Sequence, residues 1–503
     1  MLQKINRQKY LEIFLLALII ILGLFLRVFP AFKLEIWFDE AYTVFTSNQP
    51  FWRLIWLEPV HPPLFYWLIK IWSQIRTDVF FLRIPSLIFS FFNFLLIYLI
   101  AKEIKFNKYF PTLTVLFFTL SHLNIEESFQ IRMYALVLML MLLSFWAFLK
   151  ILFNSQGLKF YLFVFCLVNF LGLFTDYAFI WYYLALTLGV FIFLFLRENR
   201  LSKKQLIFLD YGFWISSALM ILWLPVFVRN LSRALSYLYS PPSILREIKG
   251  LFLSSQTSLF SFDSIYFFIL MICASYGGFL LLRVFLHSKR TKEFSVWLII
   301  NLFFYLTIFG AIIIFLFFNH TVISSRNMLV GTLFPIFSLS GLISFWWSQK
   351  KFFWQFLGGI ILIFIILVGF LSLKNSFLYR GKTFNGAPSA KDAAEFVKNN
   401  MKFDSETLIF IPRWEYLVFN YYFLDYDQKE KKDKLTEGVY KRQVYENVLS
   451  ERKKGKYLFV NFYYDEYFKE KYIEEKDDFL SECLKFNKTV HYKDAYFLRC
   501  SID

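Results

Sequence analysis

Long apolar runs separated by short polar segments dominate the chain up to about residue 373. Runs long enough to cross a bilayer lie at roughly 10–32, 79–100, 128–149, 177–196, 207–228, 262–286, 295–318, 328–347 and 354–372. Two shorter runs, 109–121 and 160–175, can span only if they tilt or if the membrane thins locally. Hydrophobic residues make up 58% of the chain, which excludes a soluble globular fold. Over 1–375 the pattern predicts an all-α polytopic membrane domain with about eleven transmembrane helices.

The C-terminal part of the chain, residues 374–503 (here called the tail), has a different pattern of hydrophobic and polar residues. Residues 376–390 form a predicted linker, because "GKTFNGAPSA" (381–390) combines Gly, Pro and Ser. Beyond it, "SAKDAAEFVKNN" (389–400) has a serine cap and a helical pattern, whereas "TLIFIP" (407–412) and "KYLFVNF" (456–462) are typical of buried strands. "KTVHYKDAYFLRC" (488–500) suggests a closing hairpin. We therefore expect a small α/β domain over 391–503.

Basic residues gather in the short segments between the apolar runs, and they set the expected orientation. They cluster around 4–9, 102–108, 150–159, 197–204, 289–292 and 350–351. Because Lys and Arg are enriched in cytoplasmic loops, the N-terminus is expected in the cytoplasm and segments 33–78, 229–261 and 374–503 outside. The net charge of +17 therefore reflects topology. Since no basic soluble fold accompanies it, it does not indicate a nucleic-acid partner.

The first outer segment, 33–78, is amphipathic and rich in tryptophan, so we expect short helices along the membrane interface. Its "WFDEAYT" (37–43) places Asp39 and Glu40 side by side. Acids at a helix start can simply cap free amides and complement the helix dipole. The alternative is that they serve chemistry at the outer boundary.

Further along the same segment, "HPPLFYW" (61–67) places His61 directly before two prolines that start a new helix. His61 and Glu58 are candidate phosphate or metal ligands, and a capped interfacial turn is the alternative. Glu126, Glu127 and Asp176 also lie at the outer boundary. They are further candidates for contacts with a metal or an acceptor.

Three arginines lie near the expected outer helix ends: Arg83 on the second helix, Arg132 on the fourth and Arg326 on the tenth. Arginines at such positions can snorkel to the interface. All three arginines are expected at the same depth in the membrane. This favours a second interpretation, in which they bind one shared anion, because the guanidinium group suits phosphate.

The cysteines carry less information. Cys166 and Cys273 lie in apolar runs and are expected to pack. Cys483 and Cys500 share the tail and can pair if it faces an oxidising compartment, but two cysteines do not make a disulfide framework.

Taken in order, the motifs resemble a known family. "WFDEAYT", "HPPLFYW", "RIPS" (83–86), "RMYAL" (132–136) and the late Arg326 resemble the membrane-embedded C-type (GT-C fold) glycosyltransferases. The similarity is greatest to the bacterial branch related to protein O-mannosyltransferases and lipid A aminoarabinose transferases. It implies transfer of a sugar from a polyprenyl-phosphate donor to a lipid, glycan or protein acceptor outside the bacterial cytoplasmic membrane. It also implies Asp39 as catalytic base with Glu40 as companion, and His61 and Arg326 near the donor phosphate.

The sequence departs from this pattern at several positions. Gln130 stands where relatives often have an acid, and Asp176 follows Thr175 where they often have His. His61 replaces a common Lys before the prolines, and Glu58 lies in a shifted register. These departures leave open whether a divalent metal is bound and which sugar is transferred.

The chemistry also follows from the residues themselves. A sugar phosphate has a good leaving group, so an acceptor hydroxyl needs a base and the phosphate needs cations. Asp39 supplies the base in an inverting displacement, and His61, Arg83, Arg132 and Arg326 supply the phosphate contacts. No Gly-rich nucleotide loop is visible. The rival functions are a lipid or glycan transporter or flippase, and a glycan ligase or polymerase on the same fold. Matching internal halves, typical of transporters, are not evident.

Overall fold

The structure is a computed structural model that describes most of the chain before residue 236 and parts of the rest. The described residues are 2–57, 61–104, 106–153, 156–177, 179–196, 202–235, 329–348, 351–373, 391–392, 394–395, 399, 406–411, 418, 421–422, 455–461, 489–492 and 495–502. They divide into two compact units. The first comprises 1–30, 49–68 and 84–377, and the second comprises 31–48, 69–83 and 378–503.

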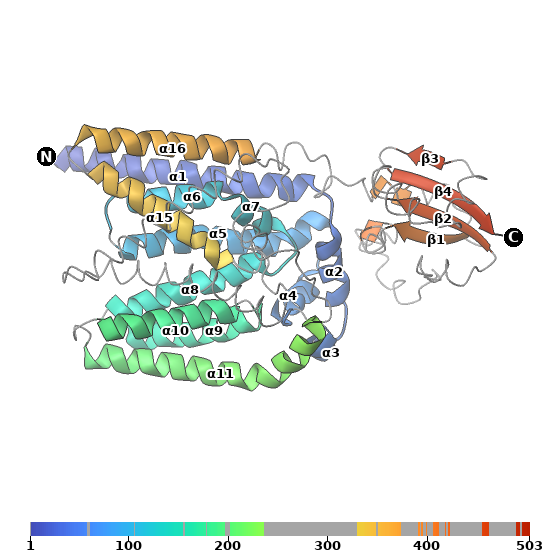
Figure 1. Cartoon of the computed structure of the whole chain (residues 1–503), viewed down its shortest axis with the longest axis horizontal. Helices are drawn as coiled ribbons and strands as arrows, with labels where there is room; N and C mark the ends of the chain where they lie inside the picture. The colour runs from blue at the N-terminus through green and yellow to red at the C-terminus, as the bar shows by residue number, and fades with distance from the viewer. Residues whose placement is uncertain are drawn as a thin grey trace. The chain divides into compact units, whose positions relative to one another are not determined.

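Helices, most of them long and apolar, make up most of the first unit. They are α1 (Leu2–Lys33), α5 (Val79–Ile104), α6 (Phe110–Leu120), α7 (His122–Phe129), α8 (Tyr134–Phe153), α9 (Leu158–Leu173), α10 (Phe179–Leu196), α11 (Lys203–Leu235), α15 (Leu329–Ser348) and α16 (Phe352–Leu373). The ends of α1 and α5 continue into the second unit. Helix α9 packs between α8 and α11, and α15 packs against α6 and α16 (Figure 1).

The expectation of a mostly helical membrane fold is confirmed. Nine of the eleven expected runs coincide with helices, and the runs 262–286 and 295–318 lie outside the described residues. Within the described part, four helices are long and apolar enough to cross a membrane: Tyr10–Lys33, Val79–Ile104, Tyr134–Phe153 and Lys203–Asn230. The total of eleven and the orientation stay predictions.

The run 128–149 differs from the expected single helix. Helix α7 ends at Phe129, and α8 begins only at Tyr134. Between them, Gln130 has extended backbone with ψ 151°, and the Arg132 amide donates to the Gln130 carbonyl at 2.7 Å. Arg132 therefore lies in a break before the helix rather than in its outer end. Hydropathy does not reveal this break, because the segment contains neither Gly nor Pro.

A buried arginine stabilises the end of α6. Arg27 on α1 is fully buried, and its guanidinium donates to the carbonyls of Phe118 at 3.2 Å and Thr119 at 3.5 Å. Both carbonyls belong to the last turn of α6, where backbone donors become scarce and the helix dipole is negative; the Phe118 carbonyl also accepts the Ser121 amide at 3.4 Å. The guanidinium also lies over the rings of Phe94 and Phe118, 4.6 and 5.2 Å from their centroids. Arg27 thus caps a helix too short to span the membrane by itself.

Buried polar side chains join the remaining helices of the first unit. Ser144 on α8 donates to the Asn169 side-chain oxygen on α9 at 2.7 Å, and Asn169 donates to Ser216 on α11 at 3.3 Å. Tyr183 on α10 hydrogen-bonds Ser217 on α11 at 3.0 Å. Such interhelical hydrogen bonds hold helices together in a membrane, where apolar packing alone gives little preference.

The segment 33–78 contains short helices, as expected. They are α2 (Phe38–Ser47), α3 (Phe51–Leu57) and α4 (Leu64–Trp72). Helix α3 lies in the first unit and α2 in the second, and α4 is divided between the units at residue 68. Two prolines precede α4, where their fixed backbone angle suits a helix start.

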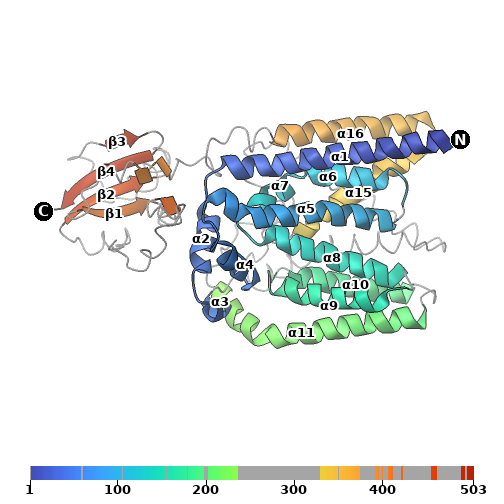
Figure 2. The same cartoon turned by 180° about the vertical axis from the view of Figure 1, so that it is seen from behind.

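The second unit also contains a four-stranded sheet in the order β1-β2-β4-β3 (Figure 2). The strands are β1 (Glu406–Ile411), β2 (Gly455–Asn461), β3 (Thr489–Tyr492) and β4 (Ala495–Ile502). Strands β1 and β2 pair in parallel, and the other pairs are antiparallel. The expected strands and the closing hairpin are confirmed, whereas the α/β domain as a whole and the linker at 376–390 stay predictions.

Candidate active site

In the second unit, the acid pair of "WFDEAYT" lies in the first turn of α2, as the capping interpretation expects. Glu40 is fully buried, and its carboxylate accepts a hydrogen bond from the Trp37 backbone amide at 3.3 Å. The Arg83 guanidinium donates to both Glu40 oxygens, from Nε at 2.8 Å and from Nη2 at 2.6 Å. This bidentate pairing is the strongest geometry available to an arginine and a carboxylate. Glu40 therefore holds the start of α2 in place.

Arg83 makes three further hydrogen bonds with the segment that leads into α2. Its Nη1 donates to the carbonyls of Ala31 at 2.8 Å and Leu34 at 2.7 Å, and its Nη2 donates to that of Glu35 at 3.0 Å. An arginine side chain has five N–H donors, and these contacts use them all. Its donors thus bind Glu40 and the backbone before α2, and the expected contact of Arg83 with the donor phosphate stays a prediction that these hydrogen bonds do not favour.

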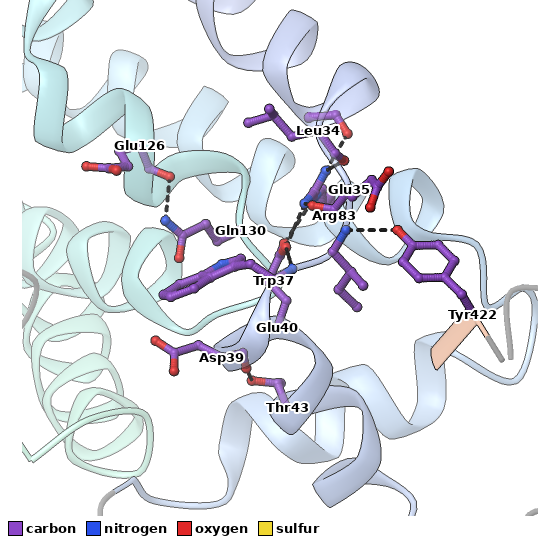
Figure 3. A network of polar contacts seen from close by, with 12 residues as sticks. Leu34, Glu35, Trp37, Asp39, Glu40, Thr43, Arg83, Glu126, Gln130 and Tyr422 are labelled. Atoms are coloured by element: carbon purple, nitrogen blue, oxygen red, sulfur yellow. Dashed lines mark hydrogen bonds and ion pairs between the residues drawn. The ribbon is translucent and has the colours of Figure 1, made fainter. Parts of the chain in front are cut away.

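Asp39 lies next to this pair but on another side of the helix. Figure 3 shows the Asp39 carboxylate projecting away from the Glu40–Arg83 ion pair. The Asp39 side chain is only partly buried, and its backbone carbonyl accepts a hydrogen bond from the Thr43 hydroxyl at 2.9 Å. The two neighbouring carboxylates therefore leave α2 in different directions. The Glu40 carboxylate is part of the ion pair with Arg83, and the Asp39 carboxylate points away from that pair.

In the first unit, His61, Arg132 and Asp176 come together. All three are buried, at 7%, 6% and 2% exposure. Nη2 of Arg132 lies 3.0 Å from Nε2 of His61, and Nδ1 of His61 lies 3.9 Å from an Asp176 oxygen. The Leu64 amide at the start of α4 donates to the Phe174 carbonyl at 3.0 Å, which ties the His-Pro-Pro turn to the end of α9. Sequence reasoning named each of the three side chains but did not group Asp176 with the other two.

The contact with Arg132 determines the protonation of His61. A guanidinium remains protonated, so it donates and His61 Nε2 accepts, which leaves the proton on Nδ1 facing Asp176. Burial lowers the pKa of His61 well below its usual value, and the Arg132 cation lowers that pKa further. The imidazole is therefore neutral and lies between a cation and a carboxyl group.

Glu126 and Glu127 are buried on α7 of the first unit. The Gln130 side chain donates to the Glu126 carbonyl at 3.0 Å (Figure 3). Among the residues that the structure describes, no three His, Cys, Asp or Glu side chains come together in a way that could hold a metal ion. The described candidates therefore do not form a metal site, and Glu58 lies outside the described residues.

Glu58 and Arg326 lie outside the described residues, so their expected roles stay predictions. The same holds for a Cys483–Cys500 disulfide, because Cys483 and the side chain of Cys500 are outside the described part. Sequence reasoning also missed Arg27, although a charge inside an apolar run was a visible signal.

Comparisons with known proteins show which family and fold the chain is similar to. Residues 60–225 match the family model of the dolichyl-phosphate-mannose-protein mannosyltransferases. That match contains the His-Pro-Pro turn, Arg132 and Asp176. A sequence comparison with curated proteins gives no match.

Solved structures share the fold. ArnT from Cupriavidus metallidurans in the apo state has a TM-score of 0.55 at 11% identity, with 98% of each chain covered. The same protein bound to undecaprenyl phosphate has a TM-score of 0.51, with 97% of each chain covered. The apo oligosaccharyltransferase of Archaeoglobus fulgidus has a TM-score of 0.54 at 12% identity over 82% of this chain. The chain spans 64% of the length of that archaeal enzyme. The resemblance inferred from the motifs is confirmed at this level: the chain has the C-type glycosyltransferase fold of these structures, and its residues 60–225 are similar to the mannosyltransferase family model.

Proposed function

We propose that the protein transfers a hexose or pentose from a polyprenyl-phosphate donor to an acceptor hydroxyl on the outer face of a bacterial cytoplasmic membrane. The matched family is named for a dolichyl-phosphate mannose donor, and ArnT was solved with undecaprenyl phosphate. A donor with a polyprenyl tail suits a chain with several apolar helices, because the tail stays in the bilayer while the sugar reaches the boundary. The acceptor is a lipid, a glycan or a protein.

One observation carries the assignment of the base. The two acids of "WFDEAYT" differ in environment: Glu40 is enclosed by Arg83, and the Asp39 carboxylate projects away from that pair (Figure 3). A general base must reach the proton that it removes. Because the Asp39 carboxylate projects away from the ion pair, we assign Asp39 as the base and Glu40 as the residue that positions it.

The reaction is a single displacement. Asp39 accepts the proton of the acceptor hydroxyl as that oxygen forms a bond with the anomeric carbon. The bond between the anomeric carbon and the phosphate oxygen breaks, and its electron pair leaves with the polyprenyl phosphate. Because attack and departure occur on opposite faces of the carbon, the product has the inverted configuration. Catalysis by a positioned base contributes typically 10²–10⁴-fold.

The leaving phosphate needs hydrogen-bond donors, and we assign this role to Arg132 and Arg326, with His61 holding the Arg132 guanidinium in place. Arg132 is supported by its buried guanidinium, held at the break before α8. His61 supports Arg132 as a neutral acceptor at Nε2. Stabilising charge in a buried environment is worth more than in water, because solvent screening is weaker.

The direct test uses the purified protein in liposomes. Undecaprenyl phosphate carrying labelled mannose, glucose or a pentose is supplied as the donor, and lipid and protein from the source membranes as the acceptor. We expect the label to move into a product with inverted configuration and undecaprenyl phosphate to be released. Label that crosses the bilayer chemically unchanged would support a transporter instead. That result, or no transfer from any of the donors, would overturn the proposal.

The outward orientation has its own test. A cysteine introduced at Lys391 in a variant that lacks the native cysteines should react with a membrane-impermeant maleimide added to intact cells. A matched cysteine at Lys102, at the end of α5 expected in the cytoplasm, should be protected. The opposite labelling pattern would reverse the orientation.

A further inference from the structure

Two adjacent tyrosines of the tail bind the first outer segment within the second unit. The Tyr422 hydroxyl accepts a hydrogen bond from the Ile36 backbone amide at 3.1 Å. The Tyr421 hydroxyl donates to the Thr77 carbonyl. Tyr421 is fully buried and Tyr422 is 8% exposed. Residues far apart in the sequence therefore make specific buried contacts.

The two contact points lie beside the residues that form the ion pair at the start of α2. Ile36 precedes Trp37, whose amide binds Glu40. Thr77 precedes Asp78, whose carboxylate accepts the Phe81 amide at 3.0 Å in the first turn of α5. That helix carries Arg83. Tyr421 and Tyr422 thus bind the two segments that the Glu40–Arg83 ion pair connects: the peptide before α2 and the peptide before α5.

A third contact involves the same segment. The Lys391 amide donates to the Glu35 carboxylate at 3.4 Å. The Glu35 backbone carbonyl also accepts a hydrogen bond from Nη2 of Arg83 at 3.0 Å. The peptide between Leu34 and Trp37 is therefore bound by Arg83 and by the tail.

The buried hydrogen bonds make this arrangement sensitive to single atoms. Removing the Tyr422 hydroxyl leaves the Ile36 amide without this acceptor, and a buried amide without an acceptor is destabilising. Burial raises the pKa of the Tyr422 phenol, and the nearby Glu35 raises that pKa further. The hydroxyl is therefore protonated and uncharged at neutral pH.

We propose that Tyr421 and Tyr422 are positioning residues for catalysis, through which the C-terminal segment fixes the peptide that carries Asp39. The inference rests on the proposed function, because it gives the tail a part in placing the catalytic base. It differs from a purely structural role of the tail. A structural contact changes the amount of folded protein, whereas a positioning contact changes the rate at which each folded molecule reacts.

The expected signature is a separation of kcat from KM. Tyr422→Phe, Tyr421→Phe and the double variant keep the rings and remove only the hydroxyls. We expect kcat to fall about tenfold in each single variant, which corresponds to ~1.4 kcal/mol of transition-state stabilisation, and to fall further in the double variant. KM for the donor should change less than twofold, because neither tyrosine is assigned to the phosphate. Tyr211→Phe is the matched control, because Tyr211 is exposed on α11.

Hydrogen–deuterium exchange gives a readout that needs no activity. Amides of the peptide 34–40 should exchange faster in Tyr422→Phe than in the wild type or in Tyr211→Phe. Unchanged exchange there, or an unchanged kcat per folded molecule in the double variant, would overturn the inference.

The Asp39→Asn variant separates this inference from the proposed function. If Asp39→Asn is inactive while the double tyrosine variant keeps the wild-type kcat, only the inference fails. If Asp39→Asn retains transfer, the proposed base is wrong, and faster exchange in Tyr422→Phe still reports that the tail holds this peptide.

Discussion

Arg83 and Glu40 form a bidentate ion pair. The Arg83 guanidinium donates to both carboxylate oxygens of Glu40, at 2.8 and 2.6 Å, and neither side chain is exposed. Breaking a buried ion pair by removing one partner costs roughly 3–5 kcal/mol, because the other charge remains buried without compensation. We therefore expect Arg83→Met and Glu40→Leu each to lower the melting temperature of the detergent-solubilised protein by several degrees. Together they should cost less than the sum of the two single changes.

The matched control for this pair is Arg76→Met. Arg76 also pairs with a carboxylate, Asp78, at 2.8 Å, but the Arg76 side chain is 64% exposed. Exposed ion pairs contribute about 0–1 kcal/mol, so this variant should melt close to the wild type. If Arg83→Met melts like Arg76→Met, Arg83 is not a structural residue, and the expected contact between Arg83 and the donor phosphate is favoured instead.

Arg27 gives a second prediction, on the short helix α6. Arg27→Met removes the guanidinium donors to the Phe118 and Thr119 carbonyls and leaves only the Ser121 amide, 3.4 Å from the Phe118 carbonyl, to cap the last turn of α6 among the described contacts. We expect a lower melting temperature and faster amide exchange over Ser121–Phe129, because α7 follows directly. Arg53→Met is the control, since the Arg53 side chain is exposed and donates to the Gln49 side chain four residues earlier at 3.3 Å. Equal melting and exchange in Arg27→Met and Arg53→Met would show that the cap contributes nothing.

His61 gives a third prediction, on pH. Because burial and Arg132 lower the pKa of His61 in the folded protein, the unfolded chain binds more protons just below pH 6.5. Stability should therefore be full above about pH 6.5 and fall as the pH decreases below that value. His61→Gln cannot take up this proton, so its melting temperature should change less over pH 6.5–5. The measurement is the melting temperature of both proteins across that range. Parallel curves would mean that His61 does not titrate in this way.

The apolar pattern predicted the helices well. A segment in the membrane must hydrogen-bond its backbone groups internally, as a helix does, and it needs a long run of apolar side chains. It did not reveal the break at Gln130–Met133, since polar and apolar residues continue there without Gly or Pro. The sequence could place Arg83 near a helix end, but not show that five acceptors converge on it. Hydrogen bonds between distant segments are set by packing, which sequence periodicity does not contain.

The same limit applies to the candidate site. The motif order named Asp39, His61 and Arg132, and the structure adds the contact between the last two and the proximity of Asp176. Tyr421 and Tyr422 carry no motif, and their contacts with Ile36 and Thr77 span more than 340 residues of sequence. Local sequence signals cannot identify such partners.

The central claim is that Asp39 is the base, and single-turnover transfer by Asp39→Asn tests it most directly. The variant keeps the size of the side chain and removes its basicity. Asp210→Asn, an exposed acid on α11, is the matched control. With equal amounts of folded protein, we predict that Asp39→Asn transfers sugar roughly 10²–10⁴-fold more slowly than the wild type, while Asp210→Asn retains the full rate. A wild-type rate in folded Asp39→Asn would contradict the account.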